Sequence, residues 1–114
     1  RNNTNQITSL SLPLKNGSRI VQIDEVNYFE ASNNYCVIHM INRDEFVISK
    51  TLKEYEEILG DNRFIRIHKS FLVNRDQISA YNRKDGMSIE LKNGAELPVS
   101  RRKQSQFIDE FNLN

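Results

Sequence analysis

The chain has 114 residues and a net charge of +1, with 38% hydrophobic and 27% charged residues, which is typical of one globular domain with a well-solvated surface. Its longest apolar runs have only the length of a strand, so a membrane-crossing segment is excluded, and no signal peptide is visible. The single cysteine, Cys36, excludes an internal disulfide and a cysteine-rich zinc site, which leaves a reducing, cytoplasmic setting as the expectation.

The first part of the chain predicts a series of short strands. Residues 1–6 are polar, and we expect them to be the remnant of a linker, with residues 7–114 forming the domain. Segments rich in β-branched and aromatic residues alternate with turn signals, of which Asn16-Gly17 is the clearest. We expect strands at residues 7–14, 18–23, 26–31, 35–41 and 46–48, with tight connections at 24–26 and 32–34.

A helical pattern interrupts the strands after residue 50. Thr51 and Glu54 have the spacing of a capping box, and apolar residues then follow at helical intervals. Gly60 is a typical residue at which a helix ends. The pattern therefore predicts one short amphipathic helix between Thr51 and Gly60.

Strand patterns return in the second part of the chain. Asp85-Gly86 and Asn93-Gly94 are strong turn signals, and Ser100 is suited to cap a last helix. Many short strands with only two short helices predict a mainly β architecture, without β-α-β units or a helix-turn-helix pair. Strands are expected at residues 78–81, 87–91 and 96–99, and the last helix carries Phe107, Ile108 and Phe111 on its apolar side.

The near-neutral net charge conceals two oppositely charged parts of the chain. Residues 24–61 contain nine acidic and three basic residues, whereas residues 63–103 contain ten basic and four acidic residues. A chain that separates its charges in this way can present one basic face, which favours a polyanionic partner. The alternative is that folding mixes the two parts into an ordinary surface.

Residue patterns for catalysis or metal binding are not found in the sequence. The two histidines, His39 and His68, have no metal-ligand spacing, and His39 lies in an apolar alternating segment where a structural histidine is expected. Motifs for a nucleophile elbow, a phosphate-binding loop or a calcium loop are missing. Cys36 lies among apolar residues, as a core cysteine would. We therefore expect no enzymatic activity, no metal and no cofactor.

Polar and apolar residues are interleaved between residues 64 and 75. The apolar members can anchor this segment while the polar members face outward at fixed positions. Lysine and arginine neutralise phosphates, serine bonds phosphate oxygens, and asparagine or lysine reaches base edges. The alternative is a strand and loop whose polar side chains meet only water. The outward-facing set is Arg66, His68, Lys69, Ser70, Asn74 and Arg75.

A second group of cations follows Pro98-Val99. Arg101, Arg102 and Lys103 lie at the predicted start of the last helix, where the helix dipole favours anions over cations. A phosphate that docks there would use the free backbone amides and the charged side chains together. The alternative is that the long side chains extend into solvent, since the dipole effect is only about 0.3–1 kcal/mol.

Three runs of residues together resemble the LytTR domain in order and spacing. They extend from Tyr28 to Tyr35, from Phe64 to Asn74 and from Leu97 to Arg102. The middle run follows the specific pattern R-x-H-[KR]-S-[FY]-x-V-N, and the last contains P-V-S-R-R. The resemblance covers about residues 18–111.

The resemblance implies a mainly β, elongated fold of short antiparallel sheets with two short helices, which lays loops into successive major grooves. It implies sequence-specific binding of double-stranded DNA by a bacterial transcription regulator. Such a domain is the output domain of a two-component response regulator and follows a receiver domain, which is missing here. Paired direct repeats are the expected target, and whether two copies dimerise on DNA is left open.

Positions that match the motifs receive the family's roles. The resemblance assigns base contacts to Asn33, Asn34, Tyr35, Lys69 and Arg102. It assigns phosphate contacts to His68, Ser70, Asn74, Arg75, Arg101 and Lys103. It places in the core Tyr28, Phe29, Ile38, Phe64, Phe71 and Val73.

Two other functions remain as alternatives. A small β domain can offer an exposed strand edge to a partner peptide, which would make the chain a protein-interaction module without DNA binding. A hydrolase built around His68 and a carboxylate is the second alternative, and the lack of another catalytic residue in the motif argues against it.

Overall fold

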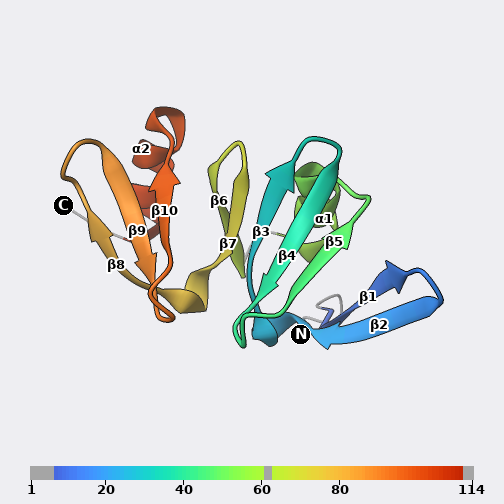
Figure 1. The fold of residues 1–114 in the computed structure, drawn as a ribbon. Helices are drawn as coiled ribbons and strands as arrows, with labels where there is room; N and C mark the ends of the chain where they lie inside the picture. Colours follow the sequence, from blue (N-terminus) through green and yellow to red (C-terminus); the bar gives the residue numbers. More distant parts are fainter. Residues whose placement is uncertain (1–6, 61–62, 112–114) are drawn as a thin grey trace, which may run out of the picture.

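The computed structural model describes residues 7–60 and 63–111 (Figure 1). Within these ranges the chain forms three antiparallel sheets and two α-helices, so the mainly β prediction is confirmed. The molecule measures 46 × 38 × 23 Å along its principal axes. Neither of the described helices is long and apolar enough to cross a bilayer. The predicted linker at residues 1–6 lies outside the described ranges.

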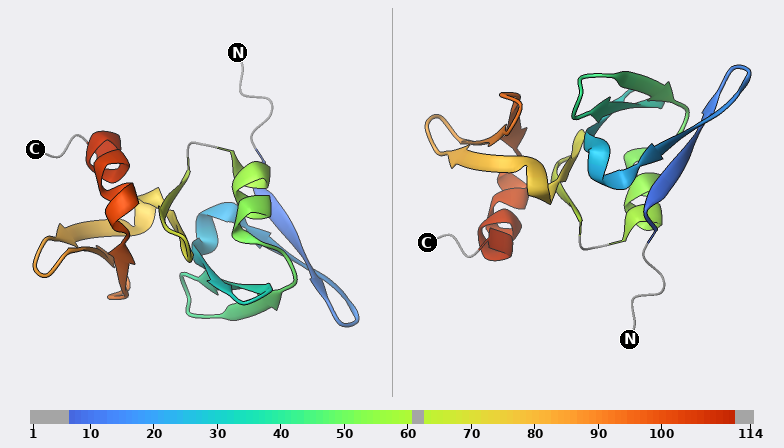
Figure 2. Two further views of the ribbon diagram at one scale, coloured as in Figure 1. Left: turned by 90° about the horizontal axis from the view of Figure 1, so that it is seen from above. Right: turned by 90° about the horizontal axis from the view of Figure 1, so that it is seen from below.

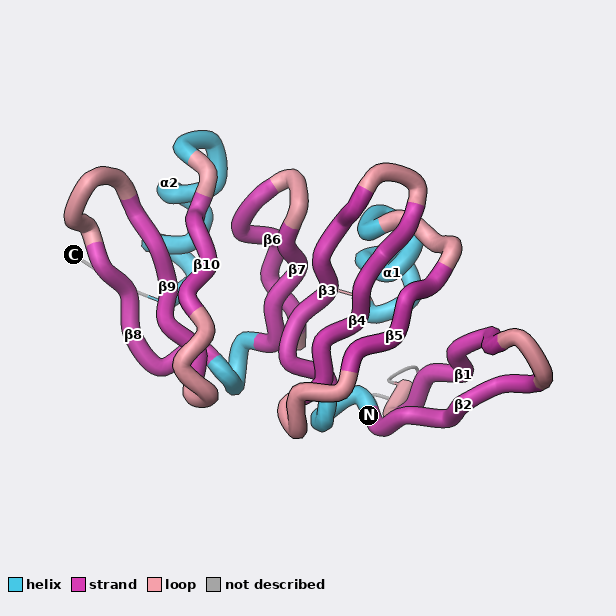
Figure 3. Tube along the Cα trace, in the orientation of Figure 1, coloured by secondary structure: helices cyan, strands magenta, loops and turns pink. Residues whose placement is uncertain are grey.

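The elements follow the predicted order closely (Figure 3). The strands are β1 (Ser9–Leu14), β2 (Gly17–Gln22), β3 (Val26–Ser32), β4 (Tyr35–Met40), β5 (Glu45–Ile48), β6 (Phe64–His68), β7 (Phe71–Asn74), β8 (Ile78–Asn82), β9 (Met87–Leu91) and β10 (Glu96–Val99). The α-helices are α1 (Leu52–Leu59) and α2 (Arg101–Phe111). Short 3-10 helices at Ile23–Glu25 and Arg75–Gln77 connect strands. The first of them ends β2 one residue earlier than predicted, because Ile23 turns into the core.

The strands form a hairpin, a large sheet and a small sheet. β1 pairs with β2, the five-stranded sheet has the order β5-β4-β3-β7-β6, and the three-stranded sheet has the order β10-β9-β8. The pairing of β3 with β7 joins segments far apart in sequence, with Tyr28 opposite Val73. Both helices lie behind the sheets in the view of Figure 1, and Figure 2 shows the same arrangement from above and below.

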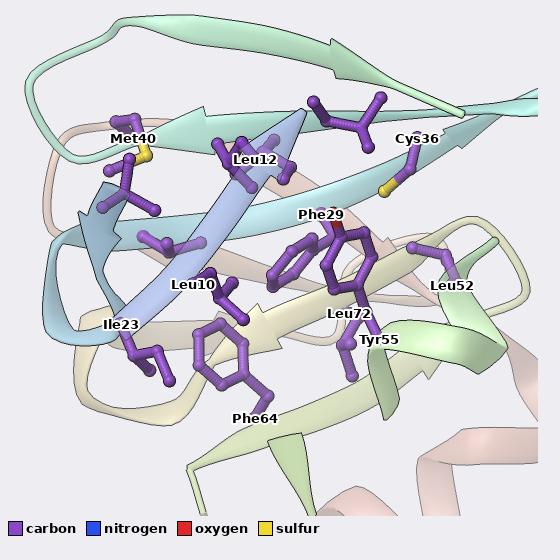
Figure 4. Close-up of a cluster of buried hydrophobic side chains, with 14 residues drawn as sticks. Leu10, Leu12, Ile23, Phe29, Cys36, Met40, Leu52, Tyr55, Phe64 and Leu72 are labelled. Atoms are coloured by element: carbon purple, nitrogen blue, oxygen red, sulfur yellow. The ribbon is translucent and has the colours of Figure 1, made fainter. Parts of the chain in front are cut away.

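The first hydrophobic core lies between α1, the β1–β2 hairpin and one face of the five-stranded sheet (Figure 4). Phe29 packs against Tyr55 of α1 with ring centroids 4.7 Å apart. The capping box that fixes α1 is present: the Thr51 hydroxyl accepts from the backbone N–H of Glu54, and the Glu54 carboxylate accepts from that of Thr51. Gly60 adopts a φ of 79°, which suits glycine at the end of the helix.

Cys36 and His39 both lie where a residue with a structural role is expected, as the sequence predicts. Cys36 is buried in the first core, where burial raises the pKa of its thiol to about 12 and disfavours a reactive thiolate. His39 stacks on Tyr28 with ring centroids 4.2 Å apart. Its Nε2 lies 2.9 Å from a carboxylate oxygen of Glu30, and its Nδ1 lies 3.3 Å from one of Glu45.

The second hydrophobic core lies between α2, the three-stranded sheet and the β6–β7 hairpin. Side chains alternate across the hairpin, so that Phe64 and Leu72 join the first core while Ile65, Ile67 and Val73 join the second. The hairpin is therefore a wall shared by both cores. This shared wall places the start of α2 beside the end of β6.

Four of the six predicted core residues are buried: Phe29, Ile38, Phe64 and Val73. The other two, Tyr28 and Phe71, are only partly buried. Their rings contact each other at the margin of the second core, with centroids 6.0 Å apart. Alternation along β3 turns Phe29 inward and Tyr28 to the opposite face, where the sheet is not fully covered.

Candidate nucleic-acid interface

Three segments singled out by the sequence reach the same side of the molecule. The β3–β4 turn, the β6–β7 turn and the β10–α2 junction all lie along the upper edge in Figure 1. The antiparallel pairing of β3 with β7 places the first two turns at the same end of the five-stranded sheet, and the β10–α2 junction belongs to the three-stranded sheet. The β8–β9 turn reaches this edge as well, with Arg83 and Lys84 exposed.

The β6–β7 turn is held by the side chain of Arg66. Its Nε donates to the backbone carbonyl of His68 at 2.8 Å, and its Nη2 donates to that of Lys69 at 2.6 Å. On the other side of the turn, the carbonyl of Ser70 accepts from the backbone N–H of Ala31 in β3 at 2.9 Å. Three consecutive carbonyls of the turn are therefore engaged, and the turn has a defined shape.

His68 is oriented by the backbone of the same turn. Its Nδ1 lies 3.1 Å from the backbone nitrogen of Ser70, which donates to it. A ring nitrogen that accepts a hydrogen bond carries no proton, so the neutral ring is protonated at Nε2. The turn therefore sets the tautomer of His68 and leaves an N–H donor at the other end of the ring. Such a donor suits a phosphate oxygen.

The β10–α2 junction is attached to the end of β6. The backbone N–H of Ser100 donates to the carbonyl of Ile67 at 2.8 Å, and α2 begins at the next residue. Arg101 and Arg102 are exposed in the first turn of α2, and that turn contains no acidic residue. Backbone amides and cationic side chains therefore occur together at this helix start.

These two segments form the walls of one hollow of about 560 Å³. The β6–β7 turn and the β10–α2 junction contribute most of its lining, and α1 contributes a single carboxylate. That carboxylate, Glu56, forms an ion pair with Arg66. The remaining charged groups are positive, so the hollow is a concave site for an anion. It is lined by Glu56, Arg66, His68, Lys69, Ser100, Arg102 and Lys103.

The β3–β4 turn differs from these two segments, because its side chains are exposed and lie outside the hollow. Ser32, Asn33, Asn34 and Tyr35 are all exposed, and Tyr35 retains 51% of its accessible surface. Asn33 adopts a φ of 57°, a left-handed conformation that asparagine tolerates better than most residues. These side chains make no hydrogen bond to other residues within the described ranges and do not line the hollow.

The side chains of two predicted contact residues, Asn74 and Arg75, are engaged within the fold. Asn74 is only 4% exposed, and its amide donates to the carbonyl of Val26 and accepts from the backbone N–H of Asp76. Arg75 forms an ion pair with Glu110 at 2.8 Å and lies over the ring of Phe111. Both side chains join elements of the fold.

The other predicted positions are accessible. His68, Ser70 and Lys103 are partly buried, and Lys69, Arg101 and Arg102 are exposed. The prediction that Arg66 and Asn74 face outward is wrong: Asn74 is buried, and Arg66 turns its guanidinium to the turn carbonyls and Glu56. An arginine placed just before a tight turn is the only signal in the sequence that could have indicated its contacts with the turn carbonyls.

Comparison with known proteins agrees with this fold. A family model described as the LytTr DNA-binding domain matches residues 16–112. A solved structure, the LytTr DNA-binding domain of a putative methyl-accepting/DNA response regulator from Bacillus cereus, superposes with a TM-score of 0.81 at 26% identity. The match covers 92% of this chain and 97% of that one.

Two curated relatives are similar over most of this chain. Accessory gene regulator protein A of Staphylococcus aureus strain N315 is 32% identical over 83 residues, which cover 71% of this chain and 34% of the relative. The protein of the same name from Staphylococcus epidermidis is 34% identical over 88 residues, covering 74% and 35% respectively. The chain thus spans about a third of the length of these relatives.

Proposed function

Because the chain belongs to the LytTR DNA-binding domain family, we propose that it binds double-stranded DNA in a sequence-specific manner as the output domain of a bacterial transcription regulator. The observation that carries the proposal is the hollow in which Lys69, Arg102 and Lys103 meet. A concave site with this charge, next to the first turn of a helix, fits the DNA backbone.

Phosphate contacts would be made around the hollow. Lys103 and Arg101 neutralise phosphates, Ser70 and the Nε2–H of His68 donate to phosphate oxygens, and the first turn of α2 adds its backbone amides. These contacts fix the position of the duplex and are not specific for sequence.

Base contacts would come from loops on either side of the clamped backbone. Lys69 and Arg102 have side chains long enough to reach guanine in the major groove. The exposed β3–β4 turn offers Asn33, Asn34 and Tyr35, of which asparagine suits adenine. Asn74 and Arg75 act in this proposal through the fold, because their polar groups are engaged within it.

The whole protein would be a cytoplasmic two-component response regulator, with a receiver domain before this output domain. We propose paired direct repeats as its target, with two copies placed side by side on DNA. The domain itself would have no catalytic activity and would use no cofactor. The names of the relatives, a gene regulator, and of the solved domain, part of a putative response regulator, support the regulator role in this proposal.

Selection of bound duplexes from a random oligonucleotide pool tests the proposal directly. We expect one motif to be enriched, and its recurrence at a fixed spacing would reveal paired repeats. If about six to eight phosphates are neutralised, the logarithm of the affinity should fall with the logarithm of the salt concentration at a slope of about −5 to −7. A folded protein that enriches no sequence would refute the proposal and favour the protein-interaction alternative.

Substitution of Arg102 distinguishes base contact from phosphate contact. Arg102→Ala should weaken binding to the selected duplex by about 1–3 kcal/mol. If Arg102 contacts a base, the preference at one position of the motif relaxes. Equal weakening on every duplex would instead make Arg102 a phosphate contact.

A further inference from the structure

All three nitrogens of the Arg66 guanidinium have partners. Nε and Nη2 bind the carbonyls of His68 and Lys69, and Nη1 binds the carboxylate of Glu56. The side chain of Arg66 is 19% exposed, although it lies in the wall of the hollow. A side chain with these contacts joins the β6–β7 turn to α1.

We propose that Arg66 is a positioning residue for DNA recognition, which holds the β6–β7 turn in its binding shape and couples that shape to α1 through Glu56. This inference rests on the proposed function of the hollow. Arg66 acts through Lys69 and His68, whose backbone carbonyls it binds, and makes no phosphate contact of its own.

The geometry of the turn explains why an arginine is needed. Two successive carbonyls, of His68 and Lys69, point toward one side chain, and the planar guanidinium supplies parallel donors to both. A lysine carries the same charge but has no fixed fork. With the carbonyls bound, the backbone N–H of Ser70 stays directed at His68, so the ring orientation depends on Arg66 as well.

The charge balance explains why Arg66 is not a phosphate contact. Glu56 pairs with its guanidinium, so the pair adds little net charge to the hollow. Three of the five N–H groups of Arg66 are already engaged, and a phosphate at the remaining two would be repelled by the nearby Glu56 carboxylate. Lys69 and Arg102 line the same hollow, and neither has a carboxylate partner within the described residues.

The test compares Arg66→Lys with the wild-type chain on two duplexes, the one selected from the random pool and a scrambled version. Because Arg66→Lys keeps the charge and loses the fork, we expect affinity for the selected duplex to fall about 10-fold or more, since hydrogen bonds from a charged group are lost. Affinity for the scrambled duplex should change by less than about threefold, because nonspecific binding follows charge. Binding to the selected duplex within about twofold of wild type would overturn the proposal.

Hydrogen exchange at Ser70 provides a readout that does not depend on DNA. Its backbone N–H should exchange about 10-fold faster in Arg66→Lys, whereas amides of the β3–β4 ladder keep the wild-type rate. If the wild-type chain bound no duplex, the proposed function would fail, and Ser70 exchange would still report whether Arg66 holds the turn. Unchanged exchange at Ser70 would overturn the proposal even if DNA binding is weakened.

Glu56→Gln tests the coupling to α1 without altering Arg66, and it remains informative if Arg66→Lys does not fold. We expect the affinity for the selected duplex, divided by that for the scrambled duplex, to fall about threefold. Loss of the Arg66–Glu56 ion pair weakens specific binding, whereas loss of a negative charge in the hollow favours both duplexes. Glu57→Gln is the matched control, since Glu57 is exposed on the same helix and does not line the hollow. Equal ratios in the two variants would overturn the coupling.

Discussion

The two helices of the molecule begin in opposite ways. α1 follows Thr51 and has an acidic residue, Glu54, in its first turn, and the two side chains form a complete capping box. α2 begins with Arg101, Arg102 and Lys103 and has no acidic residue in its first turn. At the start of α1 the capping box bonds two backbone amides and places an acidic residue where the dipole favours one, whereas the start of α2 places cations there.

The start of α1 therefore serves the stability of the fold, whereas the start of α2 is suited to bind a ligand. At the start of α1 the backbone N–H groups of Thr51 and Glu54 are bonded to side chains, and the carboxylate of Glu54 would repel an anion. The start of α2 lies in the wall of the hollow, where a phosphate would supply the negative charge that the sequence leaves out. Substitutions at the two helix starts should therefore affect different measurements.

The largest effect is expected when the charge at the start of α2 is reversed. Arg102→Glu should reduce affinity for the selected duplex by about 100-fold or more, because a phosphate contact is replaced by repulsion. Fluorescence anisotropy at physiological salt measures it. Lys92→Glu is the matched control, because Lys92 is exposed in the β9–β10 turn at the opposite end of the strands. Equal losses in both variants would mean that only net charge matters.

An intermediate effect is expected at the start of α1, on stability alone. Thr51→Ala removes the cap and should lower the free energy of unfolding by about 1 kcal/mol, as measured by urea denaturation. DNA affinity should remain within about twofold of wild type. Lys53→Ala, an exposed change two residues further along the chain, should alter stability by less than about 0.5 kcal/mol. A large loss of DNA affinity in Thr51→Ala would place α1 in the binding surface.

A smaller effect of opposite sign is expected for the stability of Arg102→Glu. A carboxylate in the first turn of α2 suits the helix dipole, so the free energy of unfolding should rise by about 0.3–1 kcal/mol at low ionic strength. The gain should shrink as salt is added, because the interaction is exposed. The cations at the start of α2 are expected to favour DNA binding and to disfavour the helix. A variant that loses both DNA affinity and stability would contradict this expectation.

The smallest effect concerns the pH dependence of α1. The backbone N–H of Thr51 donates to the Glu54 carboxylate and holds its pKa below the ordinary value of 4.5. A lowered pKa in the folded state means that the stabilisation is present above pH 4.5 and is lost as the pH falls through the folded pKa. Wild type should therefore be more stable than Glu54→Gln near neutral pH, and the difference in urea midpoint should shrink in acid. A difference in urea midpoint that does not change with pH would show that the ionised carboxylate of Glu54 does not stabilise α1.

Local features of this fold are predictable from the sequence because their causes are local. The capping box predicts α1, and Asn16-Gly17 and Asp85-Gly86 mark hairpins that the structure contains. The division into three sheets is not predictable in this way. The pairing of β3 with β7 depends on contacts across more than 40 residues, and no local pattern encodes it.

The same distinction applies to the candidate site. The cations at Lys69 and Arg102 are visible in the motifs, and the fold brings them to one hollow. The engagement of Asn74 with the carbonyl of Val26 and of Arg75 with Glu110 requires elements distant in sequence. A motif therefore identifies which residues matter, and tertiary contacts decide whether each one faces a ligand or supports the fold.

The β6–β7 hairpin has a consequence for how the molecule comes apart. Since Phe64 and Leu72 belong to one core and Ile67 and Val73 to the other, neither core is complete without the hairpin. Loss of either half exposes apolar side chains of the other, so we expect one cooperative melting transition and no stable half-domain. For the same reason a proteolytic cut on either side of the hairpin should release no folded fragment, because each fragment would contain an incomplete core.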